Sequence, residues 1–296
     1  MSDSFQLTRN KLQAQFFNAG IFSAANIFFF ESIGSSMDVA AELAKTRSSE
    51  KELAAMLRNA LLNQTYSRTH PTDIVIAFEQ TKGRGQKGRS WFSVPGEGGY
   101  LTFCFYSDRQ ALKIAGFSLV LGIAVVRALA PRQLTLALKW PNDVLALRQP
   151  GGELRKLAGI LVEASSSGAE VQSVLAGIGI NLTHSSFPED VPGVSLLQLS
   201  SSRLDYAELV ATLSKTVLEV AEEYFTKGFI AFKEEWLQFA LLEGVQVRRD
   251  ISRVDSEAAF ELGRVTGVAE DGGLLALFPD KRRPEVVYSG EVELTR

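Results

Sequence analysis

The chain has 296 residues, of which 46% are hydrophobic, so it can bury a substantial core in one large domain and a small one. Its 31 Lys and Arg against 34 Asp and Glu exclude a globally basic, nucleic-acid-binding surface. A single cysteine, Cys104, excludes an internal disulfide and a cysteine metal cluster; we expect a small buried side chain in a strand.

No membrane or targeting segment is predicted. The apolar stretch Phe16–Phe30 is interrupted by Asn18, Gly20 and Asn26, is too short to span a bilayer, and precedes no small-residue cleavage site. We therefore expect a cytoplasmic protein.

The first predicted strand ends at Ile27–Glu31, and a polar turn then leads into a helix over Val39–Lys45. Ser35 and Ser36 lie at the start of that helix, where their hydroxyls either cap it or receive a ligand. Ser49 and Glu52 fit a capping box that opens an amphipathic helix. This helix and the polar stretch after it, to Thr72, are predicted to form a surface excursion.

A basic glycine loop, Glu79–Trp91 (EQTKGRGQKGRSW), lies between strands predicted at Asp73–Phe78 and Tyr100–Tyr106. Glycine allows close backbone approach and Lys and Arg supply positive charge, so this composition predicts an anion-binding loop. The loop fits neither a dinucleotide fold nor a P-loop, because both need a helix next. Ser90–Gly99 instead contains proline, three glycines and no helical periodicity.

Downstream, a long apolar helix is predicted over Lys113–Ala130, followed by a hairpin over Leu134–Leu147 with Lys139-Trp140-Pro141-Asn142-Asp143 at its turn. Strands are predicted at Lys156–Ala164 and Val174–Leu182. In the latter, Gly177 and Gly179 leave one face without side chains, on which another element or a ligand ring would pack.

Two helices then follow, one starting at Asp205 and one over Gly228–Ala240. His184 precedes them in a loop, and with no second His or Cys nearby we expect no metal there. From Gly244 the pattern changes to short strands that predict a small β-barrel. They are Val245–Arg249, Ala258–Gly267, Leu274–Phe278 and Val286–Val292.

Taken together, the order of these motifs resembles the biotin protein ligases. The motifs are Ser35-Ser36-Met37, Gln80-Thr81 with the glycine loop, KWPNDV, KLAGILVE and GIGINL. The resemblance implies an α+β catalytic domain related to the class II aminoacyl-tRNA synthetase fold, with an SH3-like barrel at the C-terminus. We expect an extension over residues 1–26, a catalytic domain over 27–241 and the barrel over 242–296.

The resemblance also implies an ATP-dependent reaction, with Mg²⁺ accompanying ATP at residues that the sequence does not identify. Biotin becomes biotinyl-5′-AMP, and a lysine of a biotin carboxyl carrier domain then receives the biotinyl group. Charge develops around the phosphate, so Arg84 and Lys156 are the candidates for neutralising it. Asp143 is the third catalytic candidate, as anchor either for the attacking amine or for Mg²⁺.

By the same resemblance, the remaining roles divide between the two ligands. The biotin-binding candidates are Ser35, Ser36, Met37, Gln80, Arg84, Gly85, Gln86, Lys156, Gly159, Gly177 and Gly179. The ATP-binding candidates are Arg84, Arg89, Trp91, Asn142, Lys156 and Asn181.

The chain departs from the family pattern at Gln86, where a cation is common, and we expect Arg89 or Lys87 to compensate. Too few residues precede Glu31 for a helix-turn-helix domain, so we expect no DNA binding. Two other functions stay open: lipoate or octanoate transfer on a related fold, and a non-catalytic biotin-binding regulator. The sequence leaves open whether the chain forms a homodimer.

Overall fold

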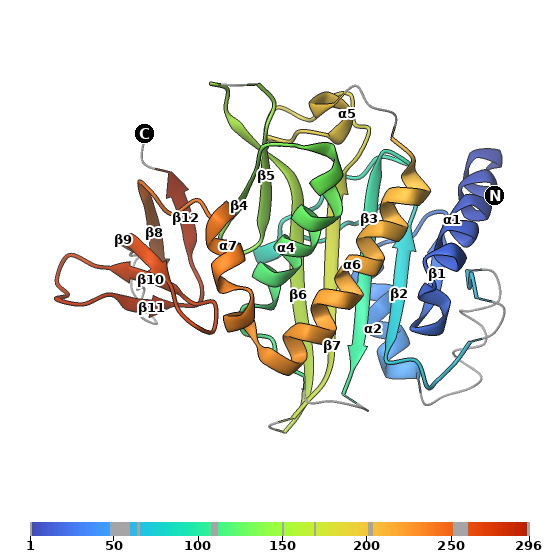
Figure 1. Ribbon diagram of the computed structural model, residues 1–296, viewed down its shortest axis with the longest axis horizontal. Coiled ribbons are helices and arrows are strands. Elements are labelled where there is room, and N and C mark those ends of the chain that lie inside the picture. Colours follow the sequence, from blue (N-terminus) through green and yellow to red (C-terminus); the bar gives the residue numbers. More distant parts are fainter. Residues whose placement is uncertain are drawn as a thin grey trace.

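A computed structural model describes residues 2–47, 60–63, 66–107, 112–149, 151–168, 170–200, 204–250 and 260–294. They form a seven-stranded mixed sheet in the order β1-β2-β3-β7-β6-β5-β4 and a five-stranded sheet in the order β11-β10-β9-β8-β12 (Figure 1). The strands of the large sheet are β1 (Ala25–Phe30), β2 (Thr72–Ala77), β3 (Gly98–Tyr106), β4 (Leu136–Lys139), β5 (Asp143–Leu147), β6 (Leu154–Ser167) and β7 (Glu170–Asn181).

Strands β1 and β2 are parallel, whereas the other neighbours in this sheet are antiparallel. Alternation along β3 gives the sheet two different faces. Leu101, Phe103 and Phe105 join the main apolar core, while Cys104 joins a smaller one on the other face. The predicted burial of Cys104 is confirmed, and burial raises the pKa of its thiol to about 12.

Helices cover the two faces unequally. Helices α4 (Phe117–Leu129), α6 (Tyr206–Lys227) and α7 (Lys233–Phe239) lie in front of the sheet in Figure 1, and α2 (Ser36–Thr46) lies behind it. Helix α1 (Asp3–Asn18) packs beside α6 and contributes Phe5, Leu12 and Phe16 to the main core. A short helix, α5 (Leu196–Leu199), precedes α6.

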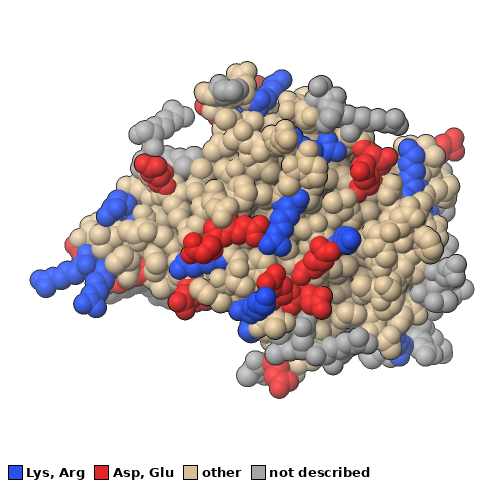
Figure 2. All heavy atoms as spheres, in the orientation of Figure 1, with Lys and Arg blue, Asp and Glu red and all other residues tan. Residues whose placement is uncertain are grey.

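Acidic and basic side chains alternate over the helix-covered face shown in Figure 2. Ion pairs on these helices include Lys227 with Glu223 within α6 and Arg127 of α4 with Glu235 of α7. None of the helices in the described ranges is long and apolar enough to span a membrane.

Several predicted elements differ from the structure. Helix α4 begins at Phe117, because Gly116 has a left-handed backbone (φ 75°). The helix predicted over Gly228–Ala240 is a 3-10 turn, Phe229–Ala231, followed by α7. The strand predicted over Val286–Val292 is two strands, β11 (Glu285–Val287) and β12 (Glu291–Leu294).

The predicted surface excursion is partly wrong. Its helix at Ser49 lies outside the described residues, but Ala60–Asn63 extend the sheet beside β1. Phe29 N–H donates to Ala60 O and Leu62 N–H donates to Ile27 O, both at 2.8 Å. Ala60 and Leu62 are buried, so this part of the chain covers the sheet edge.

The small sheet contains β8 (Val245–Asp250), β9 (Phe260–Val268), β10 (Leu274–Leu277), β11 and β12. It joins the large sheet through the Asp271-Gly272-Gly273 turn, where the buried Trp140 indole N–H donates to Gly272 O at 3.1 Å. The Trp140 ring at the KWPND turn therefore contacts the small domain and links it to the large one.

Candidate functional site

The side-chain-free face predicted at Gly177 and Gly179 lies on the α2 side of the sheet. Gly179 pairs with Gly159 of β6, and Gly177 pairs with Leu161. A Cβ at Gly159 or Gly179 would lie 2.7 or 2.5 Å from the Trp91 ring, and one at Gly177 would lie 2.7 Å from Met37 Sδ. The protein's own Trp91 and Met37 therefore cover this face, and larger residues would collide with them.

Trp91 reaches the glycine face because the basic loop folds back on itself. Gly85 N–H donates to Arg89 O at 2.7 Å, and Trp91 N–H donates to Gly83 O at 2.9 Å. A 3-10 turn, Gln86–Gly88, lies at the tip, with Lys87 in the left-handed region (φ 55°). The loop thus forms a flap whose base places the indole on the sheet.

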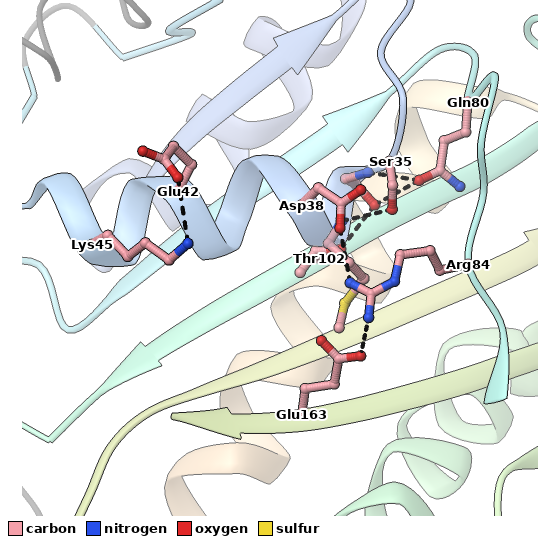
Figure 3. A network of polar contacts seen from close by, with 10 residues as sticks. Ser35, Asp38, Glu42, Lys45, Gln80, Arg84, Thr102 and Glu163 are labelled. Atoms are coloured by element: carbon pink, nitrogen blue, oxygen red, sulfur yellow. Dashed lines mark hydrogen bonds and ion pairs between the residues drawn. The ribbon is translucent and has the colours of Figure 1, made fainter. Parts of the chain in front are cut away.

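A buried hydrogen-bond network lies beside this face (Figure 3). Ser36 Oγ donates to Gln80 Oε1 at 3.0 Å, and the Ser36 backbone N–H donates to the same oxygen at 2.7 Å. Because the Ser36 hydroxyl proton goes to Gln80, the hydroxyl of Thr102 donates to Ser36 Oγ at 2.8 Å. Ser35 caps α2, accepting from Met37 N–H at 3.3 Å. These bonds fix the polar end of the cavity.

Lys156 and Asp143 form an ion pair beside Gly159 of the glycine face. Lys156 Nζ lies 2.7 Å from Asp143 Oδ1 and 5.2 Å from the centroid of the Trp91 ring. Both side chains are partly buried, at 33% and 22% exposure, so the pair is only moderately screened. The lysine charge is thus held against the indole at the edge of the glycine face.

Arg84 reaches from the flap to two carboxylates on different elements (Figure 3). Its Nη1 donates to Asp38 Oδ1 of α2 at 2.9 Å, and its Nη2 donates to Glu163 Oε1 of β6. The guanidinium therefore bridges α2 and β6 across the site.

Two neighbouring cavities meet at this flap. The smaller is about 50 Å³, room for only a few waters, and contains the glycine face and the Ser36 network. The larger is about 950 Å³ and lies between the flap, the start of α4 and two turns of the small sheet. Arg84, Gly85, Gln86 and Leu161 line both.

The structure brings most of the predicted residues together at the smaller cavity. Its lining includes Ser35, Ser36, Met37, Gln80, Arg84, Gly85, Gln86, Trp91, Asn142, Lys156, Gly159, Gly177 and Gly179. Lys87 and Arg89 line the larger cavity, and Asp143 reaches the smaller one through Lys156.

The two asparagines make structural bonds. Asn142 Nδ2 donates to Ile160 O at 2.8 Å and holds the hairpin turn against β6. Asn181 Nδ2 donates to Lys156 O at 3.1 Å and to Val194 O at 3.2 Å. Asn181 is not among the residues that line either cavity in the described part of the chain. Nucleotide contacts by these two residues stay a prediction.

Sequence reasoning did not single out Thr102, Asp38 or Glu163. Each lies in a stretch that was recognised for another reason: a strand, a helix start and the KLAGILVE motif. Strand alternation from Gly159 through Leu161 to Glu163 was the available signal for Glu163, since it places all three on one face. His184, expected in a loop, is fully buried, with its ring 5.2 Å from the Phe187 ring.

Comparison with known proteins assigns this α+β fold and its site to a protein family. Residues 51–181 match the model of the Biotin/lipoate A/B protein ligase family. The chain is 32% identical over 226 residues to the Biotin--[acetyl-CoA-carboxylase] ligase of Paracoccus denitrificans, covering 74% of this chain and 88% of that protein. It therefore belongs to the biotin protein ligase family.

Other relatives extend the comparison. The Bifunctional ligase/repressor BirA of Bacillus spizizenii is 30% identical over 75% of this chain, which spans 66% of that protein's length. The biotin protein ligase of Aquifex aeolicus, solved in complex with biotin and ATP, superposes with a TM-score of 0.66 at 25% identity. That superposition covers 92% of this chain and 99% of the other, so it includes both sheets.

Proposed function

We propose that the protein activates biotin with ATP and transfers the biotinyl group to a lysine of a biotin carboxyl carrier domain. A biotin carboxylate oxygen bonds to the α-phosphorus of ATP, and the bond to the pyrophosphate leaving group breaks. The lysine amine then attacks the acyl carbon, losing a proton as AMP leaves.

One observation carries this proposal. Residues from separate sequence motifs converge on one small cavity, whose floor is Gly159 and Gly179 and beside which lie a hydrogen-bond network and an ion pair. A floor without side chains, bordered by neutral polar groups and by a cation, suits a ring with a polar edge and a carboxylate tail. The Aquifex relative binds biotin and ATP on the same fold.

Within this proposal, Ser35, Ser36 and Gln80 hold the polar edge of biotin. Arg84 and Lys156 neutralise charge on the reacting phosphate, as preorganised cations in a partly water-excluded site. Asp143 either anchors the incoming amine or binds Mg²⁺. The present contact of Trp91 with Gly159 and Gly179 means that the indole must move before a ligand ring can occupy the floor.

Other parts of the proposal rest on the family. Among the described residues, no group of three or more His, Cys, Asp and Glu side chains could hold a metal ion. We propose that Mg²⁺ accompanies ATP. We infer a cytoplasmic protein with an extension over 1–26, a catalytic domain over 27–241 and a small domain over 242–296. The proposed reaction can proceed in a monomer or in a homodimer.

The alternative is lipoate or octanoate transfer, because the matching family model covers both biotin and lipoate ligases. The relatives above that are named for one substrate are biotin ligases, which favours biotin.

The test is pyrophosphate release after incubating the protein with MgATP and either biotin or lipoate. We expect release that depends on biotin and not on lipoate. Release that depends on lipoate would establish the alternative, and no release with either acid would establish a non-catalytic protein. Adding a biotin carrier domain should convert the adenylate to a biotinylated lysine, detected as a mass increase of the carrier.

A further inference from the structure

Both cations proposed to act on the phosphate are already paired with carboxylates. Lys156 is paired with Asp143, and Arg84 is paired with both Asp38 and Glu163. The positive charges that an incoming polyphosphate would contact are therefore already neutralised by carboxylates of the protein. The Arg84 group is the more unusual, because two carboxylates share one guanidinium (Figure 3).

The two carboxylates have separate supports. Asp38 lies in the first turn of α2, two residues after Ser36, and Glu163 lies on β6, four residues after Gly159. Arg84 joins them from the flap, with its side chain 38% exposed, while Asp38 and Glu163 are 61% and 36% exposed. Ion pairs this exposed contribute little to stability, so a phosphate can exchange with them.

The bridge also lies where the two cavities meet, since Arg84 and Leu161 line both. Biotin in the smaller cavity and a nucleotide reaching from the larger one would have to join across this guanidinium. A guanidinium has five N–H donors, and the two carboxylates here engage two of its nitrogens. A phosphate that binds Arg84 must therefore either displace a carboxylate or share the guanidinium with two negative charges.

We propose that Asp38 and Glu163 are positioning residues that hold Arg84 between them and compete with the nucleotide phosphates for it. This inference rests on the proposed function. Their charges set the nucleotide affinity: neutralising either one removes a competitor for Arg84 and a negative charge beside the phosphate. The contacts that tie the flap to α2 and β6 are thus made by the same guanidinium that the nucleotide needs.

The test compares Glu163→Gln and Asp38→Asn with the wild-type protein. A non-hydrolysable ATP analogue is titrated calorimetrically in MgCl₂, and the KM for ATP is measured by biotin-dependent pyrophosphate release. We expect each variant to bind the analogue about three- to tenfold more tightly, as for one charge removed near a partly exposed site. The KM for ATP should fall in parallel, without a matching rise in kcat.

Glu42→Gln is the matched control, because Glu42 lies one turn further along α2 and pairs only loosely with Lys45, at 3.7 Å. It removes the same charge from the same helix, and we expect an unchanged affinity. In an Arg84→Ala background, Glu163→Gln should change the affinity by less than about twofold, because its effect acts through Arg84.

Unchanged or weaker binding in both Glu163→Gln and Asp38→Asn would overturn the inference, as would an equal gain in the Arg84→Ala background. The calorimetric measurement needs no turnover. A protein that binds the analogue as expected but releases no pyrophosphate would contradict the proposed function alone.

Discussion

Lys156 is the residue on which the proposed chemistry depends most directly. Its ammonium group lies 2.7 Å from Asp143 and over the Trp91 ring, beside the glycine floor. A single preorganised cation that stabilises developing charge contributes about 10²-fold or more to the rate. We therefore expect Lys156→Ala to slow biotin adenylation by about that factor.

Single-turnover formation of biotinyl-5′-AMP is the measurement, since it separates adenylation from transfer and product release. Lys215→Ala is the control, because Lys215 is an exposed helix residue paired with Glu219 at 3.9 Å. Near-wild-type adenylation by Lys156→Ala would show that another cation has the role.

The site residues that could be predicted from the sequence have a local sequence signal, whereas the others do not. Glycines and cations stand out in the basic loop because their composition is unusual there. Thr102, Asp38 and Glu163 have no such local signal. Each matters only because β3, α2 and β6 bring it within hydrogen-bond distance of Ser36 or Arg84, which is a property of the tertiary structure.

Among the elements, the three strands β1, β2 and β3 contain a buried charge away from the proposed site. Asp73 is fully buried; Asn26 Nδ2 donates to its Oδ1, and the Tyr106 hydroxyl donates to its Oδ2, both at 2.7 Å. Burial, the largest cause, raises the pKa of Asp73 above its ordinary value of 3.8. The Asp73 carboxyl group therefore binds a proton more tightly in the folded protein than in the unfolded chain.

It follows that the stability contributed by Asp73 is complete below its unfolded pKa and is lost as the pH rises through the folded pKa. Asp73→Asn is neutral at every pH and avoids this loss. We expect the free energy of unfolding of the variant, relative to wild type, to increase from pH 4 to pH 7, by about 1.4 kcal/mol per unit of pKa shift.

Urea unfolding at several pH values measures this slope. The exposed Asp280→Asn is the control and should run parallel to wild type. A difference between Asp73→Asn and wild type that does not change with pH would contradict the prediction.

The sequence predicts the elements well where their pattern is strong. The buried strands β2 and β3 were expected within two residues of their observed bounds, because their apolar runs are bounded by polar or glycine residues. Strand β7 begins at Glu170, four residues before its expected start, because its polar first residues pair with β6. The start of α4 was predicted too early, because the helix begins only after the left-handed backbone of Gly116, which the local sequence pattern does not show. The division of 286–292 into β11 and β12 depends on pairing with β10 and β8, which no local pattern records.

At the scale of the whole molecule, the two sheets are joined by an unusually close backbone contact. Gly116 before α4 and Gly272 in the small domain both have left-handed backbones, with φ of 75° and 90°. A Cβ on Gly272 would lie 2.6 Å from Gly116 Cα. The Trp140 bond to Gly272 O is made at the same place, so the relative position of the domains depends on this turn.

Substituting Gly272 by Ala should therefore separate these two backbones and weaken the Trp140 bond. Left-handed strain alone costs about 1–2 kcal/mol, and forcing a methyl into a packed contact costs about 1–3 kcal/mol more. Gly151→Ala is the control: its φ is 76°, but a Cβ there would meet nothing within 4 Å. Urea unfolding followed by tryptophan fluorescence should show the larger loss in Gly272→Ala. Equal losses in the two variants would mean that backbone strain alone, and not the contact between the sheets, requires glycine at this turn.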